Sequence, residues 1–163
     1  MNGIDEVARR VAASLKQRGE TVAVAESSSG GLISAALLAV PGASAFFMGG
    51  AVVYTRDAKT SLLNIPDALL DEFRSASEPN ASILARAARE ILGTTWGMAE
   101  TGAAGPTGNR YGDAAGHVCI AVAGPAEIVK TIETGDSDRA ANMRVFAAAA
   151  LTLLDEALQA MPE

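Results

Sequence analysis

The feature that most constrains the fold is a short apolar stretch followed by a serine and glycine cluster and a second apolar stretch. Residues 21–25 are small or β-branched, residues 27–31 read Ser-Ser-Ser-Gly-Gly, and residues 32–38 are mostly leucine, isoleucine and alanine. This order predicts a buried strand, a tight turn and a helix. The three hydroxyl groups therefore lie where a strand ends and a helix begins.

Such a junction suits an anion or a developing oxyanion. The first backbone N–H groups of a helix have no partner within the helix, and the helix dipole adds partial positive charge. Gly30 and Gly31 would let a ligand or another backbone approach closely, because they carry no Cβ. The alternative is structural: the serines cap the helix and the glycines pack it against a sheet. The local sequence leaves both interpretations open.

Composition limits the size of the protein and its partners. A chain of 163 residues is long enough for one compact domain, and we expect a single domain over residues 1–163. Hydrophobic residues make up 49% of the chain and aromatic residues only 4%, so alanine, valine, leucine and isoleucine must form the core. The net charge of −6 argues against a broad nucleic-acid surface, which needs clustered lysine and arginine.

The sequence also indicates the compartment. Cys119 is the only cysteine, so no intrachain disulfide can form, which fits a reducing environment. Residues 1–6 are polar and acidic, unlike a signal peptide. No uncharged apolar run reaches the ~18–20 residues of a membrane span. We therefore expect a cytoplasmic protein without membrane contact.

The rest of the chain alternates helix and strand signals early and ends with a hairpin. We predict helices over residues 4–19, 66–73, 77–91 and 138–158, and strands over residues 51–55, 95–99, 117–122 and 128–134. In the last helix we expect an inner face of Val145, Ala148, Leu151 and Leu154. This order favours an α/β fold in which a mixed sheet carries helices on both faces.

Ligands of such folds bind at strand ends, and three polar features fall there. The first is Ser27. The second is the segment 54–59, where Lys59 lies just beyond a predicted strand. The third is the glycine-rich loop over residues 102–113.

Elimination narrows the chemistry. A Ser-His-Asp triad would need His117, the only histidine, which lies in or at the start of a distant predicted strand. His117 and Cys119 share a strand face, but two ligands do not make a catalytic zinc site. What remains is a serine activated by a lysine, where Lys59 must be neutral through burial or a nearby cation. Tyr54 could relay or orient the proton. Alternatively, Lys59 is a solvated surface charge and Tyr54 an ordinary strand residue.

A resemblance to a known family covers residues 5–157. Its motifs, in chain order, are Ala25-Glu26-Ser27-Ser28-Ser29-Gly30-Gly31, Pro41-Gly42-Ala43-Ser44, Gly49-Gly50, Tyr54 with Ala58-Lys59, Ala76-Ser77-Glu78, Gly102-Ala103-Ala104-Gly105-Pro106 and Gly116. Together they resemble the C-terminal domain of the competence/damage-inducible CinA family. The resemblance implies a three-layer α/β/α sandwich with a mixed, mostly parallel sheet. It also implies a nicotinamide-nucleotide amidase, which converts nicotinamide mononucleotide (NMN) to nicotinate mononucleotide and ammonia.

The resemblance assigns roles to individual residues. It makes Ser27 the nucleophile and Lys59 its base, and Tyr54 falls on the family's tyrosine and would support the proton transfer. We expect the following residues to contact the substrate: Glu26, Ser28, Ser29, Gly30, Gly31, Gly102, Ala103, Gly105, Arg139 and Arg144. Among these, Ser29, Gly30 and Gly31 with Arg139 or Arg144 would hold a phosphate. Backbone N–H groups around residues 28–30 or 102–105 would hold the oxyanion.

No metal and no cofactor is expected, and the partner is a pyridine nucleotide substrate. We also expect a homo-oligomer, because apolar helix faces remain, and no additional N-terminal domain of the kind that some family members carry. The family's Cys-Thr pair is Ser28-Ser29 here, and its Lys-Pro-Val-Gly-Thr segment is replaced by residues 113–117, Asp-Ala-Ala-Gly-His. Acceptance of NMN by the loop at 107–115 is therefore open.

Two other functions are compatible with the resemblance. One is a nucleotide-binding or regulatory module that keeps the pocket without turnover. The other is a DNA-associated competence factor, which the negative charge disfavours.

Overall fold

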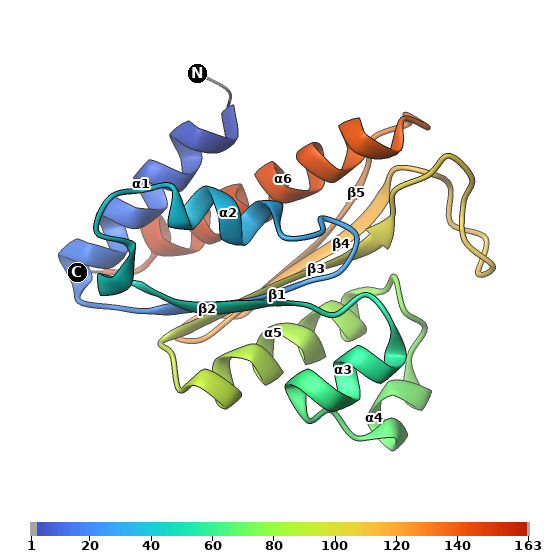
Figure 1. Cartoon of the computed structure of the whole chain (residues 1–163), viewed down its shortest axis with the longest axis horizontal. Helices are drawn as coiled ribbons and strands as arrows, with labels where there is room; N and C mark the ends of the chain where they lie inside the picture. The colour runs from blue at the N-terminus through green and yellow to red at the C-terminus, as the bar shows by residue number, and fades with distance from the viewer. Residues whose placement is uncertain (1–2, 163) are drawn as a thin grey trace.

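In the computed structural model, which describes residues 3–162, a five-stranded sheet separates two layers of helices (Figure 1). The strands are β1 (Val22–Glu26), β2 (Phe47–Val52), β3 (Trp96–Ala103), β4 (His117–Ala123) and β5 (Ile128–Glu133). The helices are α1 (Gly3–Arg18), α2 (Leu32–Leu38), α3 (Arg56–Leu63), α4 (Asp67–Glu72), α5 (Glu78–Leu92) and α6 (Arg139–Ala160), with a 3-10 helix η1 (Ala43–Ala45). The predicted α/β fold with helices on both faces is confirmed.

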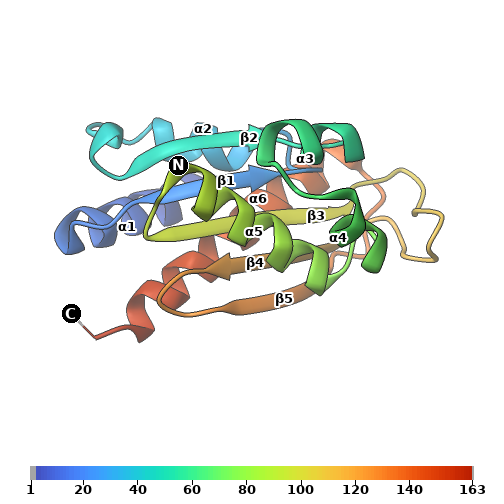
Figure 2. The ribbon, with the colours of Figure 1, turned by 90° about the horizontal axis from the view of Figure 1, so that it is seen from below.

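The sheet has the strand order β2-β1-β3-β4-β5, which can be followed in Figure 2. Strand β1 pairs in parallel with β2 and β3, and β4 pairs antiparallel with both β3 and β5. All strands except β4 therefore point the same way, as expected for a mixed, mostly parallel sheet. The carboxyl ends of β1, β2, β3 and β5 and the start of β4 lie at one edge of the sheet.

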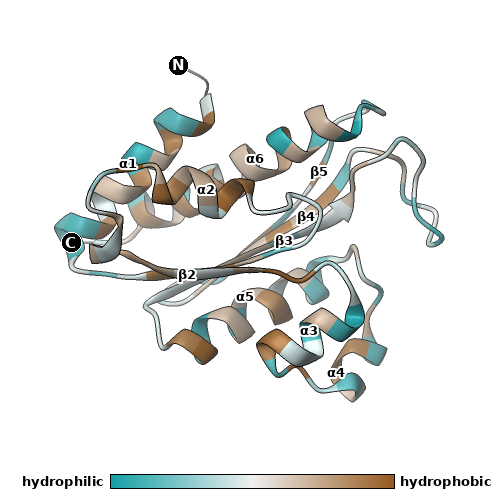
Figure 3. Ribbon diagram, viewed as in Figure 1, coloured by the Kyte–Doolittle hydropathy of each residue, from teal (hydrophilic) through white to brown (hydrophobic). Residues whose placement is uncertain are grey.

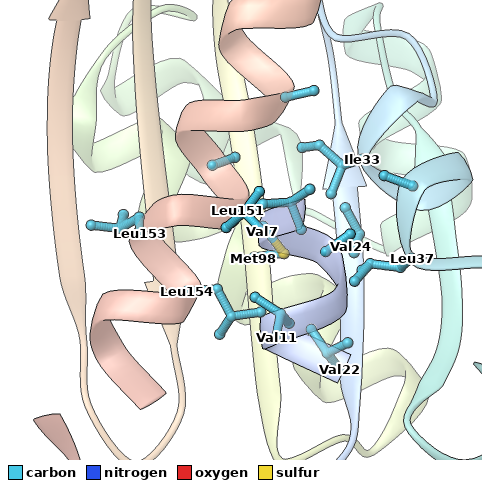
Figure 4. Packing of buried hydrophobic residues seen from close by; sticks show 14 of the residues in the cluster. Val7, Val11, Val22, Val24, Ile33, Leu37, Met98, Leu151, Leu153 and Leu154 are labelled. Carbon is cyan, nitrogen blue, oxygen red and sulfur yellow. The ribbon is translucent and has the colours of Figure 1, made fainter. Parts of the chain in front are cut away.

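The core is built from aliphatic side chains on both faces of the sheet. Helices α1, α2 and α6 cover one face, and α3, α4 and α5 cover the other (Figure 1). On the first face Val24 of β1 and Met98 of β3 pack among Ile33 of α2, Val7 of α1 and Leu154 of α6 (Figure 4). On the second face alanines dominate both α5 and the strands beneath it. Small side chains let this helix lie close to the sheet.

Two predicted boundaries around Lys59 are wrong. Strand β2 spans Phe47–Val52 instead of residues 51–55, so it includes Gly49 and Gly50. Lys59 lies on helix α3 and not on a segment beyond a strand end. Helix α3 begins at Arg56 because the side chain of Thr55 caps it, accepting a hydrogen bond from the Ala58 amide. Asp57 in the first turn adds a favourable negative charge.

The inner face of α6 and the end of one strand also differ from the prediction. In α6 Leu151 and Leu154 are buried, but Val145 is 45% exposed, because the inner stripe runs through Asn142 and Phe146 instead. Because the inward-facing residue Asn142 is polar and the helix is rich in alanine, the hydrophobic pattern does not show which face is buried. Strand β3 continues to Ala103, beyond the predicted 95–99.

The loop between β3 and β4 projects past the edge of the sheet and is drawn mostly white to teal in Figure 3. It is therefore a polar loop beside the carboxyl edge. None of the helices between residues 3 and 162 is long and apolar enough to cross a membrane.

Candidate active site

Four segments that are distant in sequence meet at the carboxyl edge of the sheet. Ser27 directly follows β1, Tyr54 follows β2, the loop from Ala104 follows β3, and α6 begins at Arg139. Parallel strands bring their carboxyl ends to the same edge, which is why the predicted polar features lie near one another. This edge is the candidate site.

A buried carboxyl group on the neighbouring strand anchors the serine turn. Glu100 of β3 is fully buried, and its Oε1 accepts hydrogen bonds from the Ser27 amide at 2.7 Å and the Ser29 amide at 2.8 Å. Its Oε2 accepts one from the Ser28 hydroxyl at 2.5 Å. Burial raises the pKa of Glu100, and the serine hydrogen bonds oppose that rise. The turn after β1 is thus fixed by β3 and not only by its own sequence.

A second buried carboxylate caps helix α2. Glu26 Oε1 accepts hydrogen bonds from the amides of Gly31 at 3.1 Å and Ile33 at 2.9 Å, and from the Ser29 hydroxyl at 2.7 Å. Its Oε2 accepts one from the Ser34 amide at 2.9 Å. The amides at the helix start, where we expected a substrate anion, therefore already bind the carboxylate of Glu26.

Glu26→Ala should lower the free energy of unfolding by about 3 kcal/mol or more. The substitution leaves buried N–H groups of α2 without an acceptor, and each such group costs about 1–3 kcal/mol. Urea unfolding near neutral pH measures the change, with Glu26→Gln as the conservative comparison that keeps one acceptor oxygen. A loss below about 0.5 kcal/mol for the alanine variant would contradict the capping role.

One backbone donor of the turn is left free. Within residues 3–162 the amides of Ser27 and Ser29 bind Glu100, that of Gly30 binds the Ser27 carbonyl at 3.2 Å, and that of Gly31 binds Glu26. The Ser28 amide has no such partner in this part of the chain, and neither does the Ser27 hydroxyl. A hydroxyl and an adjacent N–H group are therefore available together.

Lys59 is buried beside Ser75. It is 5% exposed, and its Nζ donates a hydrogen bond to the Ser75 hydroxyl at 3.2 Å. Burial lowers the pKa of Lys59, and the positive charge of Arg56 lowers it further, whereas the charge of Glu100 acts in the opposite direction. Lys59 thus lies within electrostatic reach of the carboxyl that anchors the serine turn, and its environment favours the neutral amine.

A pocket of about 210 Å³ opens beside Lys59. Its lining combines two arginines and Lys59 with aromatic rings and small polar groups: Tyr54, Arg56, Lys59, Leu70, Phe73, Ser75, Asn80, Arg110 and Tyr111. Such a lining suits a ligand that carries both an anionic group and an aromatic ring.

The structure separates the two candidate phosphate-binding arginines. Arg139 donates to the Gly105 carbonyl at 2.5 Å and to the Tyr54 hydroxyl at 3.1 Å, so it joins the segments after β2 and β3. Arg144 lies five residues further along α6, and its side chain donates to the carbonyl of Ala140 on its own helix, at 3.5 Å. It lines a different pocket, formed by α1, α2 and α6. Arg139 belongs to the candidate site, and Arg144 does not reach it.

The glycines of the third segment are explained by close packing. A Cβ on Gly102 would lie 2.5 Å from the carbonyl oxygen of His117 on β4. Gly105 has a φ of +112°, and a Cβ there would lie 2.7 Å from the Ser137 carbonyl oxygen. Ala103, the last residue of β3, is half-buried. These glycines let β4 and the segment before α6 approach, whether or not a substrate also contacts them.

The pair that we weighed as a metal site makes other contacts. Cys119 Sγ lies 3.7 Å from His117 Nε2, and both atoms face the carbonyl of Ala76. No group of three or more histidine, cysteine, aspartate or glutamate side chains in the described part of the chain could hold a metal ion.

These features define an α/β/α sandwich whose polar site lies at the carboxyl edge of the sheet. The sequence model described as the CinA C-terminal domain matches residues 4–158, and the chain belongs to this family. CinA-like proteins of Anaeromyxobacter sp. (strain K) and Myxococcus xanthus (strain DK1622) are 44% and 40% identical over 96% and 91% of the chain. These matches make up 38% and 35% of those proteins, so the chain spans under two-fifths of the curated relatives' length.

Solved structures of the same superfamily share the fold. A CinA superfamily protein from Klebsiella pneumoniae 700603 superposes with a TM-score of 0.91 at 28% identity, over 99% of this chain and 100% of that one. The competence/damage inducible protein CihA from Agrobacterium tumefaciens gives a TM-score of 0.89 at 32% identity, over 98% and 97% of the two chains.

Sequence analysis missed several polar residues of the site, among them Glu100 and Ser75. Glu100 gave a usable signal, because a glutamate inside the apolar stretch 96–101 must be paired if that stretch is a buried strand. Ser75 gave none. It lies between α4 and α5, and only the fold brings its hydroxyl to Lys59.

Proposed function

We propose that this protein is a nicotinamide-nucleotide amidase that hydrolyses the carboxamide of NMN through a Ser-Lys mechanism. The observation that carries the proposal is the buried Lys59, whose pKa is lowered, near a serine turn that is clamped by Glu100. A lysine must be neutral to take a proton from a serine, and a solvated surface lysine would not be.

In the proposed reaction Ser27 Oγ attacks the carboxamide carbon while Lys59 Nζ takes the serine proton. The Ser28 N–H donates to the oxyanion, since it is the free donor of the turn within residues 3–162. Collapse of the tetrahedral intermediate breaks the C–N bond, and Lys59 returns the proton to the leaving ammonia. Water then hydrolyses the Ser27 ester, with Lys59 again as base, to give nicotinate mononucleotide.

Substrate binding falls to the pocket beside Lys59 and to Arg139. The guanidinium of Arg139 has a fork of donors and stands between Tyr54 and the Gly105 loop, which suits a phosphate. Tyr54, 57% exposed, is placed by this contact and supports proton transfer near the substrate. Glu26 and Ser29 act through the turn, because their polar groups already hold it together.

Arg139→Ala should raise KM for NMN by about 10-fold or more with a smaller change in kcat. A phosphate contact stabilises the bound ground state and the transition state alike, so its loss weakens binding more than chemistry. Initial rates on NMN and on the nucleoside that lacks the phosphate measure the effect, with the distant Arg144→Ala as the matched control. Equal loss on both substrates would contradict a phosphate contact.

Ammonia release from NMN by the purified protein tests the proposed function. The rival is a binding module that keeps the pocket but does not turn over. We expect stoichiometric ammonia and nicotinate mononucleotide. Calorimetric binding of NMN with no ammonia formed would support the rival instead.

A further inference from the structure

His117 has no part in this mechanism, yet it is buried at the same edge of the sheet. It is the first residue of β4, the only histidine of the chain, and 4% exposed. Its Nε2 lies 2.9 Å from the carbonyl oxygen of Ala76, and its Nδ1 lies 2.5 Å from Oε1 of Glu133 on β5.

Both close partners of the ring are acceptors, and the Cys119 thiol, 3.7 Å from Nε2, donates to the Ala76 carbonyl at 3.6 Å instead. A backbone carbonyl has no proton to give, and Glu133 is an exposed carboxylate. Each ring nitrogen must therefore carry a hydrogen, which makes His117 an imidazolium. Burial by itself would lower the pKa of His117, but the hydrogen bonds to Glu133 and Ala76 and the nearby carboxylates hold that pKa above its ordinary value.

Charged and titratable groups surround His117 on the loop before β4, on β4 itself and on α5. Asp113 in the loop before β4 has Oδ1 3.6 Å from Nε2 and is itself paired with Arg74. Cys119 on β4 lies beside the ring, and Glu78 of α5 reaches Thr131 on β5. The surroundings therefore supply net negative charge, as a buried cation requires.

The imidazolium holds one end of the segment that contacts Lys59. Ala76, whose carbonyl accepts from His117, directly follows Ser75. The Ser75 carbonyl accepts from the Thr101 hydroxyl of β3 at 3.1 Å and from the Asn80 amide of α5 at 2.5 Å. The hydroxyl of the same Ser75 accepts from Lys59 Nζ. Donors on β3, β4 and α5 thus hold the carbonyls of Ser75 and Ala76. These hydrogen bonds fix the Ser75 hydroxyl next to Lys59, the proposed base.

We propose that His117, as an imidazolium, is a positioning residue that fixes Ser75 beside Lys59, so that full turnover requires its protonated form. This rests on the proposed function of Lys59. Loss of the proton removes one of the two donors, so the ring releases either Ala76 or Glu133, and the Ser75 hydroxyl is no longer held in place.

NMR of the single histidine tests the charge state directly, on protein from which any polyhistidine tag has been removed. We expect hydrogens on both ring nitrogens at neutral pH and a titration midpoint above the ordinary value of about 6.5. Glu133→Gln keeps an acceptor oxygen at an exposed position but removes the negative charge, so it should lower the midpoint. Glu127→Gln, an exposed glutamate paired with Arg86 instead, is the matched control and should not change it. A neutral ring at neutral pH would overturn the proposal.

The ratio of kcat between variant and wild type tests the link to Lys59. Below both histidine midpoints Glu133→Gln should match the wild type. Between the midpoints it should be slower, by about tenfold for each pH unit above the midpoint of Glu133→Gln, because its protonated fraction falls by that factor. His117→Gln should be slower at every pH below the wild-type midpoint, by about 10- to 100-fold. Equal rates of Glu133→Gln and wild type between the midpoints would overturn the positioning role.

A third measurement does not depend on turnover. The side-chain NMR signal of Lys59, assigned with Lys59→Arg, should shift at the His117 midpoint and move with it in Glu133→Gln. A Lys59 signal that ignores the histidine titration would overturn the proposal. If the wild type releases no ammonia while the two titrations remain coupled, the amidase function fails and the coupling stands.

Discussion

Ser27→Ala is expected to lower kcat for NMN deamidation by at least about 10³-fold without unfolding the protein. Removal of an attacking hydroxyl leaves only the rate that binding and the oxyanion donor supply. The fold should survive, because the Ser27 hydroxyl has no partner within residues 3–162 and the amide that binds Glu100 belongs to the backbone. Ammonia release measures the rate, and thermal melting checks the fold.

Ser28→Ala is the matched control for this prediction. The Ser28 hydroxyl donates to Glu100 Oε2, so its removal should cost stability, about 1 kcal/mol, and should leave turnover within about tenfold. The reverse outcome, in which Ser28→Ala is inactive and Ser27→Ala is active, would show that the nucleophile is the next residue.

Lys59→Ala is expected to lower kcat by about 10²- to 10⁴-fold, the usual cost of losing a positioned base. A small primary amine should restore part of the rate, because the deletion leaves space beside the pocket that contains Ser75. The restored rate should grow with the concentration of the neutral amine and not of its cation. Lys130→Ala, at an exposed position on β5, is the control and should keep full activity.

A restored rate that follows the ammonium ion would contradict this account, since it would mean that Lys59 supplies only positive charge. Unchanged activity of Lys59→Ala would also contradict the account, because it would show that Lys59 is not needed for turnover.

The serine turn could be predicted from sequence because its signals are local. A buried strand, a cluster of small residues and an apolar helix follow one another within residues 21–38. Each of them can be recognised from its own residues without knowledge of the fold. The position of Tyr54 and of the glycine-rich loop at strand ends follows from the same kind of pattern. Their convergence then needs only the rule that parallel strands end at one edge.

The groups that hold the site could not be predicted in the same way. The Ser27 amide and Glu100 are joined by a hydrogen bond across 73 positions, and His117 and Ala76 across 41. Such pairs depend on the strand order and on the register of β3 against its neighbours, which no single segment encodes. Helix α3 was missed because it is short and follows directly on an exposed, weakly apolar strand end.

The inner face of α6 shows a related limit. Asn142 points inward because its amide donates to the carbonyls of Ala104 and Asp136, both at 2.8 Å. A search for an apolar stripe passes over such a residue and selects the exposed Val145 instead. The wrong prediction therefore coincides with a residue that supports the site. Asn142 holds the Ala104 carbonyl, next to the Gly105 carbonyl that Arg139 binds.

The central claim is that Lys59 acts as a neutral base toward Ser27. Its most direct test is kcat for NMN deamidation as a function of pH, in the wild type and in Lys59→Arg. We predict that wild-type activity rises with pH as Lys59 loses its proton, with a midpoint below the ordinary 10.5 because burial lowers this pKa, and that it falls again as His117 loses its proton. Lys59→Arg should stay about 10²-fold or more below it at every pH, since a guanidinium keeps its proton. An arginine variant with near-wild-type turnover would contradict the Ser-Lys mechanism.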